Sequence, residues 1–159
     1  MKEVLKILEQ DARTPVEKIS TMTGMPSSEV ERTIKEAEES RIILKYKTII
    51  NWAKLEEEGV WALIEVKVIP QRDVGFDSIA ERIYRFPEVR SVYLVSGAYD
   101  LAVMVVGKSM QEVASFVSGK LAPLDIVQGT ITHFLLKRYK EDGEILEGDG
   151  EVKRLPLSI

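Results

Sequence analysis

The sequence contains no cysteine and a single histidine, His133, among its 159 residues. These absences exclude disulfides, thiolate nucleophiles, cysteine-ligated metals and centres built from several histidines, so we expect neither a metal ion nor a cofactor. Apolar runs fall far short of the roughly 20 residues that span a bilayer. The chain opens with the charged, amphipathic pattern Met1-Lys2-Glu3-Val4 rather than a signal peptide, which predicts a cytoplasmic protein.

The overall composition is that of a folded globular chain. Apolar residues make up 45% of the sequence, and 159 residues are enough for one good core or two small ones. The formal net charge of -4 argues against a nonspecific coating of nucleic acid, although it says little about one small face. The distribution of charge along the chain is therefore more informative than its total.

Apolar residues recur at helical spacing over residues 2–47. This spacing predicts a first helix that ends near Gln10-Asp11. A second helix is expected to begin with Thr14-Pro15-Val16-Glu17, which has the pattern of a capping box with proline at the first helical position. Gly24 and Pro26 then interrupt the pattern, since Gly24 permits a left-handed backbone and Pro26 favours the start of another helix.

A third helix is expected to follow at once and to reach about Glu39. Ser27 or Ser28 is the expected cap, and Ser28 with Glu31 forms a second capping-box pattern. Two helices joined by a short turn that contains glycine, behind a supporting first helix, match the helix-turn-helix plan. In that plan the last helix enters the major groove of DNA.

Residues 42–50 are rich in β-branched side chains and predict a strand or wing that leads away from the helices. Residues 51–59 are polar and rich in glutamate, which is typical of a joint between domains. We therefore expect a domain boundary there, with a DNA-binding domain over residues 1–50. Trp52 and Leu55 are expected to pack the linker against one of its neighbours.

From Val60 onward the apolar residues follow the two-residue period of strands, interrupted by two helical stretches. The predicted order is strand, helix, strand, strand, helix, strand. This order is typical of an α+β fold, a ferredoxin-like βαββαβ domain whose four-stranded antiparallel sheet carries both helices on one face. We assign it to residues 60–140 and expect an acidic tail over residues 141–159, with one edge strand through Val152 and Leu155. The expected strands are 60–69, 89–95, 101–106 and 126–139, and the expected helices start at Phe76 and after a cap at Ser109.

One face of this predicted sheet stays uncovered, although its outward positions include large apolar residues. Large apolar patches on soluble proteins generally mark an interface, so we expect a homodimer in which two sheets pack face to face. The alternative is that helical and tail residues cover the face within one chain.

A hairpin turn joins the second and third predicted strands through Ser96-Gly97-Ala98-Tyr99-Asp100. The small side chains of Gly97 and Ala98 leave backbone N-H groups reachable. Tyr99 adds an aromatic wall, and Asp100 adds a negative charge. These groups suit a small zwitterion such as an amino acid. The alternative is an ordinary turn in which Asp100 accepts local backbone hydrogen bonds.

Together these features resemble the Lrp/AsnC family, also called feast/famine regulatory proteins, over nearly the whole chain. The resemblance is carried by the helix-turn-helix from Thr14 to Glu39, by the phrase from Ile42-Ile43 through Tyr46 to Asn51, and by the Gly97-Ala98-Tyr99-Asp100 turn. Members of that family are similar to this plan in being DNA-binding dimers, often assembled into larger rings, whose sheet domain binds amino acids or related metabolites. The resemblance therefore implies a transcriptional regulator with a winged helix-turn-helix domain and a RAM/ACT-like ligand-binding domain, rather than an enzyme.

The resemblance implies a DNA contact surface on the third helix and the wing. Arg32 and Lys35 stand one helical turn apart, where they could meet bases or phosphates. Family members usually present several basic residues on this helix, whereas here Glu36 stands where Arg or Lys is common, and residues 1–50 hold nine basic and nine acidic side chains. The alternative is that Arg32 and Lys35 only pair with neighbouring glutamates on a solvated helix. The complete predicted DNA-contact set is Ser27, Ser28, Arg32, Thr33, Lys35, Lys45 and Lys47.

The resemblance also makes the hairpin an expected effector site. Backbone groups of Gly97, Ala98 and Tyr99 would receive a carboxylate, and Asp100 would receive an ammonium group or a polar tail. Residues of the last strand from a neighbouring subunit would complete the cleft, either its two threonines or, on the opposite face, His133, with the threonines favoured. The complete predicted effector set is Ser96, Gly97, Ala98, Tyr99, Asp100, Thr130 and Thr132.

Two other functional classes stay open on the residues alone. An enzyme is disfavoured, because no Ser-His-Asp or Cys-His set and no glycine-rich phosphate loop is present, and His133 with Asp100 is the only obvious acid-base pair. An interaction protein would keep the ligand-binding sheet domain, lack DNA binding, and act on a partner or on a relative by mixed assembly. The acidic third helix is the feature that supports this second class.

Overall fold

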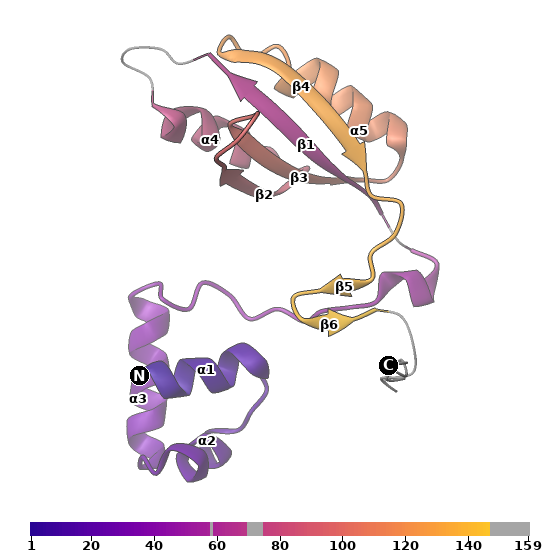
Figure 1. Cartoon of the computed structure of the whole chain (residues 1–159). Coiled ribbons are helices and arrows are strands. Elements are labelled where there is room, and N and C mark those ends of the chain that lie inside the picture. Colours follow the sequence, from indigo (N-terminus) through magenta and orange to yellow (C-terminus); the bar gives the residue numbers. More distant parts are fainter. Residues whose placement is uncertain (58, 70–74, 147–159) are drawn as a thin grey trace, which may run out of the picture. The chain divides into compact units, whose positions relative to one another are not determined.

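The computed structural model describes residues 1–57, 59–69 and 75–146. The chain divides into two compact units, Met1–Ile50 and Asn51–Ile159 (Figure 1). Residues 51–57, expected to form part of a separate joint, belong to the second unit. The edge strand expected through Val152 and Leu155 lies outside the described residues. Within the described ranges, no helix has the length and apolar character needed to cross a bilayer.

Three helices build the first unit: α1 (Lys2–Gln10), α2 (Val16–Thr23) and α3 (Ser27–Glu39). Each helix contributes one fully buried side chain to a small shared core, namely Val4, Ile19 and Val30. Gly24 follows α2 with a left-handed φ of 70°, as the sequence predicted, and its amide donates to the Ser20 carbonyl to close the last turn. The helical periods of the sequence therefore located all three helices.

Neither predicted capping box forms. The Thr14 hydroxyl donates to the carbonyl oxygen of Asp11 at 2.8 Å, so it closes the preceding turn instead of capping α2. Pro15 takes the N-cap position, one residue before the place expected for it. Pro26 is likewise the N-cap of α3, which leaves the Ser27-Ser28 pair inside the first turn of the helix. The capping expectations were wrong because each proline, with its extended ψ, defines the start of the helix that follows it.

The strand expected over residues 42–50 does not form within the described chain. The amides of Ile42 and Ile43 donate to the Ala37 carbonyl at the end of α3, and no strand pairs with the residues that follow. A strand needs a neighbour with free backbone groups, and β-branched composition alone cannot supply that neighbour. A 3-10 turn, η1 (Trp52–Leu55), then begins the second unit. Trp52 and Leu55 are both exposed, so the second unit does not bury them.

The second unit contains the predicted four-stranded antiparallel sheet, in the order β2-β3-β1-β4. The chain follows the predicted order of strands and helices (Figure 1). Ser109 caps α5 as predicted, because its hydroxyl oxygen accepts a hydrogen bond from the Glu112 amide at 3.1 Å. The elements are β1 (Val60–Val68), α4 (Phe76–Tyr84), β2 (Val89–Leu94), β3 (Leu101–Gly107), α5 (Met110–Phe116) with a π-helical extension η2 (Val117–Leu121), and β4 (Val127–Phe134).

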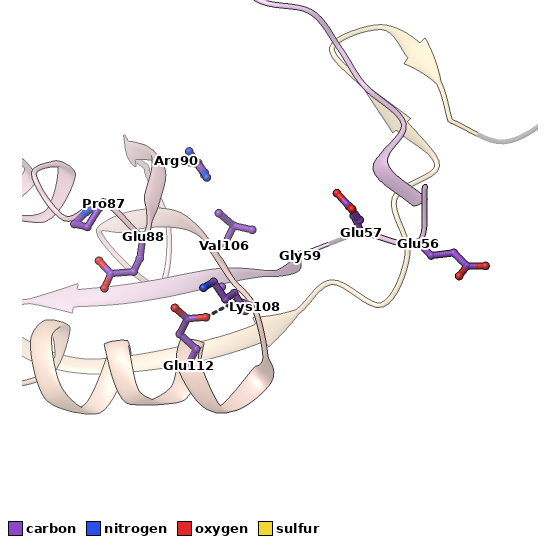
Figure 2. A pocket seen from close by; sticks show the side chains of 10 residues that line it. Glu56, Glu57, Gly59, Pro87, Glu88, Arg90, Val106, Lys108 and Glu112 are labelled. Carbon is purple, nitrogen blue, oxygen red and sulfur yellow. Dashed lines mark hydrogen bonds between the residues drawn. The ribbon is translucent and has the colours of Figure 1, made fainter. Parts of the chain in front are cut away.

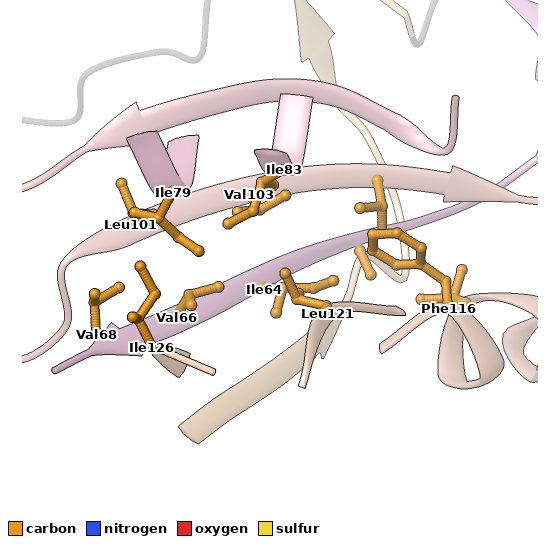
Figure 3. Packing of buried hydrophobic residues seen from close by; sticks show 13 residues of the cluster. Ile64, Val66, Val68, Ile79, Ile83, Leu101, Val103, Phe116, Leu121 and Ile126 are labelled. Carbon is orange, nitrogen blue, oxygen red and sulfur yellow. The ribbon is translucent and has the colours of Figure 1, made fainter. Parts of the chain in front are cut away.

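Alternate residues of the two central strands point into one core between the sheet and its helices. Ile64 and Val66 of β1 and Val103 of β3 are fully buried there against Ile79 and Ile83 of α4 (Figure 3). The second helix region closes the other end of this core through buried aromatic and aliphatic side chains, including Phe116 and Leu121. Both helices therefore cover the same face of the sheet, as the sequence predicted.

The opposite face of the sheet carries no helix in the described part of the chain, and we call it the open face. Its positions follow from the two-residue alternation of β1 and from the strand register. Apolar side chains dominate it, and Tyr93 and Ile131 are 57% and 58% exposed. The prediction of an uncovered, largely apolar face is therefore confirmed. The open face comprises Trp61, Leu63, Glu65, Lys67, Ser91, Tyr93, Ala102, Met104, Val106, Gly129, Ile131 and His133.

The last part of the described chain differs from the prediction. The final strand was expected to run to Tyr139, but β4 ends at Phe134. A small hairpin follows, made of β5 (Lys140–Glu141) and β6 (Glu144–Ile145). The side-chain amide of Asn51 donates to the carbonyl oxygen of Leu146 at 2.6 Å, so this hairpin meets the start of the second unit. Residues 141–146 are therefore part of the fold and not a simple acidic tail.

Candidate DNA-contact and effector sites

The two cations predicted to read DNA project from α3 and are strongly exposed. Arg32 lies 3.7 Å from the Glu36 carboxylate and Lys35 lies 3.8 Å from that of Glu39, measured between the nearest nitrogen and oxygen atoms. Exposed pairs of this kind stabilise a helix by only about 0.3–0.5 kcal/mol. The alternative pairing is thus present in the structure, yet it is weak enough for a phosphate to compete with the glutamates.

The other predicted DNA contacts are distributed unevenly. Thr33 is only 7% exposed and lies on the inner side of α3, so its selection as a DNA-contact residue was wrong. It comes three residues after buried Val30, and this spacing returns it to the face that packs on the other helices. The Ser27-Ser28 pair lies in the first turn of α3, with Ser28 exposed, and Lys45 and Lys47 are exposed on the segment that follows the helix.

The hairpin between β2 and β3 presents the small, exposed backbone that the sequence predicted. Gly97 has a φ of 141°, a value that side-chain-bearing residues rarely adopt, and a Cβ atom placed there would meet nothing within 4 Å. Ser96 and Ala98 are also exposed, whereas Tyr99 is half-buried. The turn therefore offers accessible main-chain groups beside an aromatic side chain.

Asp100 is already engaged within the fold. Its carboxylate accepts a hydrogen bond from the Val68 amide at 2.8 Å and pairs with the Lys67 ammonium at 3.3 Å. Its own amide donates to the Val66 carbonyl at 3.0 Å, which ties the hairpin to the end of β1. The bond from the Val68 amide, followed by the contact with Lys67, lowers the pKa of the Asp100 carboxyl below its usual value, against the opposing effect of desolvation.

This contact predicts an acid-sensitive difference between the protein and its Asp100→Asn variant. Because the pKa of Asp100 is lowered in the folded chain, its stabilisation is complete above the ordinary carboxyl pKa of about 3.9 and disappears as the pH falls through the lower folded value. The variant should melt below the wild type at about pH 7, and the two melting temperatures should converge toward about pH 2.

Circular dichroism melts over this pH series measure that difference. Asp125→Asn, at an exposed aspartate, is the matched control and should show no such convergence. Equal melting temperatures for the wild type and Asp100→Asn at neutral pH would contradict the assignment.

The last strand separates its polar residues onto two faces. Thr130 pairs in register with Val66 and Thr132 with Ile64, so both threonines share the helix-covered face and are half-buried at the sheet edge. His133 lies on the open face, where its Nε2 atom is 3.0 Å from Glu65 Oε1. Because Asp100 is bonded to Val68 and Lys67, the acid-base pair that an enzyme would have needed is not assembled.

A groove of about 610 Å³ at one end of the sheet contains none of the predicted site residues (Figure 2). Glu88 Oε1 accepts a hydrogen bond from Lys120 in η2, and this bond lowers the pKa of Glu88 despite the opposing effect of burial. Glu112 accepts a hydrogen bond from the Lys108 amide (Figure 2). Glu88 thus links the start of β2 to η2, and Glu112 ties the first turn of α5 to the residue pair that precedes it. The lining residues are Glu56, Glu57, Gly59, Pro87, Glu88, Arg90, Val106, Gly107, Lys108 and Glu112.

Sequence reasoning missed three polar pairs that the fold creates. Glu65 with His133 and Glu88 with Lys120 join residues 68 and 32 positions apart, and Lys67 reaches Asp100 across 33 positions. No local motif marks such pairs. Only the strand register and the path of η2 bring them together. These pairs could therefore be predicted only if the pairing of the strands were already known.

Comparison with known proteins places these features in one family. Residues 61–145 match the family described as the Lrp/AsnC ligand binding domain. Over 157 residues the chain is 50% identical to a Bacillus subtilis (strain 168) protein named as an uncharacterized HTH-type transcriptional regulator, YugG, with 98% of this chain and 95% of that protein covered. It is 30% identical over 144 residues to the HTH-type transcriptional regulator FL11 of Pyrococcus furiosus, covering 91% and 92% of the two chains.

A solved structure shares the same fold. The transcriptional regulator NMB0573 from Neisseria meningitidis, crystallised as a complex with L-Met, superimposes with a TM-score of 0.70 at 23% identity, covering 87% of this chain and 89% of that one. Both named relatives carry the helix-turn-helix designation, and neither is an enzyme. Because the family match spans more than half of the chain and the similarity to these regulators extends over nearly all of it, the chain belongs to the Lrp/AsnC family of transcriptional regulators.

Proposed function

We propose that this protein binds DNA through α3 and regulates transcription in response to an amino acid or a related small metabolite. The observation that carries the proposal is the 50% identity to an HTH-type regulator across 98% of the chain, in a fold whose α3 exposes Arg32 and Lys35. A helix with exposed cations one turn apart suits the major groove and its phosphates.

In the proposed DNA complex, α3 is the reading helix and residues 42–50 act as the wing. Arg32 and Lys35 exchange their exposed glutamate partners for phosphates or base edges, while Lys45 and Lys47 contact the backbone. Ser28, exposed in the first turn, adds a neutral donor near the helix start. Because residues 1–50 carry as many acids as bases, the affinity depends on this local cluster and not on the net charge of the unit.

The proposed effector site is the Ser96–Asp100 hairpin. The exposed amides near Gly97 suit a carboxylate, and the half-buried Tyr99 covers its apolar part. The Neisseria regulator was crystallised with L-Met, which supports an amino acid as the class of ligand for this fold. A ligand ammonium group would replace Lys67 beside Asp100, and Thr130 and Thr132 would be supplied by a neighbouring subunit.

We place the dimer interface of the proposed regulator on the open face. The apolar side chains there have no helix over them in the described chain, and a two-fold pair of sheets would bury them. A dimer also presents two α3 helices to DNA, which doubles the number of phosphate contacts. Higher assembly of such dimers into rings is the arrangement that the family resemblance implies.

The test is binding to DNA from the upstream region of the protein's own gene, measured across salt concentrations with and without each common amino acid. The double variant Arg32→Ala/Lys35→Ala removes four cations per dimer, so its affinity should fall on the order of 100-fold and its log-log salt slope should decrease by about 2 to 4. A change in affinity on adding one amino acid would identify the effector.

The matched control is Arg82→Ala/Lys140→Ala, which removes two cations from the second unit and should leave DNA binding unchanged. Salt-insensitive binding, or equal loss in both double variants, would contradict the assignment of α3. Binding of an amino acid without any DNA binding would instead favour an interaction protein that acts through a partner.

A further inference from the structure

One ion-pairing site lies within the apolar open face. Glu65 of β1 and His133 of β4 are joined at 3.0 Å, with side chains 25% and 51% exposed. Each stands directly across from an apolar residue in the register, Glu65 from Ile131 and His133 from Leu63. The pair is therefore a diagonal polar contact surrounded by side chains that a second sheet would cover.

Other charged and titratable groups lie on or beside the open face. Lys67 shares the face, two residues along β1, but its ammonium group is paired with Asp100. Tyr93 of β2 lies on the same face, in register with Ala102. Ala102 and Met104 of β3 do not titrate. At the far end of the face, Arg138 stacks 4.9 Å from the centroid of the Trp61 ring.

The protonation state of His133 decides how much net charge becomes buried when the open faces of two sheets pack together. With a neutral imidazole, the pair carries one negative charge from Glu65. With an imidazolium, the pair carries no net charge and keeps its hydrogen bond. A buried net charge is costly, and a symmetric dimer would bring two such charges together, whereas a neutral hydrogen-bonded pair is buried at far lower cost.

We propose that the Glu65–His133 pair couples assembly through the open face to proton uptake, so that mild acid strengthens the dimer. This inference rests on the proposed homodimer. It makes the oligomeric state of the regulator responsive to pH, independently of any effector. The sign is fixed by charge counting: association takes up protons, and the dissociation constant falls as the pH is lowered.

The experiment is sedimentation equilibrium of the full chain at about pH 8 and about pH 6, at constant ionic strength. The wild-type dissociation constant should fall at least about threefold between these two values, because up to one proton per chain is taken up. His133→Gln keeps a hydrogen-bond donor but cannot titrate, so its dissociation constant should be nearly independent of pH. It also reports any background change from the net charge of the whole chain.

Glu65→Gln provides the sharper test, because it reverses which protonation state of His133 gives a pair without net charge. In that variant the pair is neutral when the imidazole is neutral and carries one positive charge when it is protonated. Mild acid should therefore weaken the Glu65→Gln dimer while it strengthens the wild-type dimer. A general effect of pH on the protein surface cannot produce opposite signs in two chains that differ by one carboxylate.

A second measurement needs no variant. His133 is the only histidine in the sequence, so its ring signals are identified directly in an NMR titration of the wild-type chain. The pH at which they change should move upward as the protein concentration is raised and dimer forms.

The outcomes separate this inference from the proposed function. A dimer whose dissociation constant has the same pH dependence in the wild type, His133→Gln and Glu65→Gln overturns the coupling and leaves the homodimer standing. A monomer at both pH values and at all concentrations overturns the proposed dimer itself.

Discussion

Replacing Ile64 with alanine should lower the free energy of unfolding of the sheet unit by about 3 kcal/mol. Ile64 lies in the central strand β1, is fully buried and packs in the cluster shared by the sheet and its two helices (Figure 3). Truncation removes three carbon atoms from water-free contacts and leaves a cavity that neighbouring strands cannot collapse to fill. Urea unfolding followed by circular dichroism measures the change.

Ile145→Ala is the matched control for this prediction, because it deletes the same atoms from a side chain that is 61% exposed. Its effect should stay within about 0.5 kcal/mol. If the two alanine variants lost equal stability, the core described for the second unit would be in error.

Substitution at Leu63, one residue before Ile64 in β1, should weaken association of the chains and not their folding. The double variant Leu63→Asp/Ile131→Asp places two carboxylates on the open face beside the Glu65–His133 pair. Both positions lie outside the helix-covered core, so each chain should keep its fold. A dimer formed through this face would have to bury four added charges, and we expect its dissociation constant to rise at least about 100-fold.

Sedimentation velocity of the double variant measures this shift from dimer to monomer. Met110→Asp is the control, since Met110 is an exposed apolar side chain in the first turn of α5, where an acidic residue is well tolerated. A double variant that stayed dimeric at micromolar concentration would exclude the open face as the interface.

Local periodicity was sufficient to locate most of the fold. The two-residue alternation of β1 reflects burial directly, as does the helical spacing within α1, α2 and α3, which bury Val4, Ile19 and Val30, respectively. Ser109 caps its helix as its sequence pattern predicted. The missed β5–β6 hairpin had a local signal as well. Asp142 and Gly143 both adopt positive φ values in its turn, and an Asp-Gly pair is the strongest short-range indication of such a hairpin.

The other errors concern features that depend on tertiary contacts, which a local sequence pattern does not determine. Residues 42–50 have strand composition but lack a paired neighbour in the described chain. Thr33 is polar, yet the helical phase set by Val30 and Ala37 directs it inward. The Gly97 hairpin was recognisable as a turn, whereas the bond from the Val68 amide to Asp100 depends on where β1 ends beside it. The turn was therefore predictable from the sequence and its internal bonding was not, while its role as an effector site stays a prediction.

The bond between Asn51 and Leu146 has a consequence for how the sheet unit can be exchanged or rearranged. It brings the entry of the unit next to Leu146, so the first and last residues described in the unit adjoin. A domain whose two ends adjoin can be fused to a different domain, or circularly permuted, without straining its connections. We therefore expect the sheet unit to keep its fold when a different N-terminal domain is joined to it.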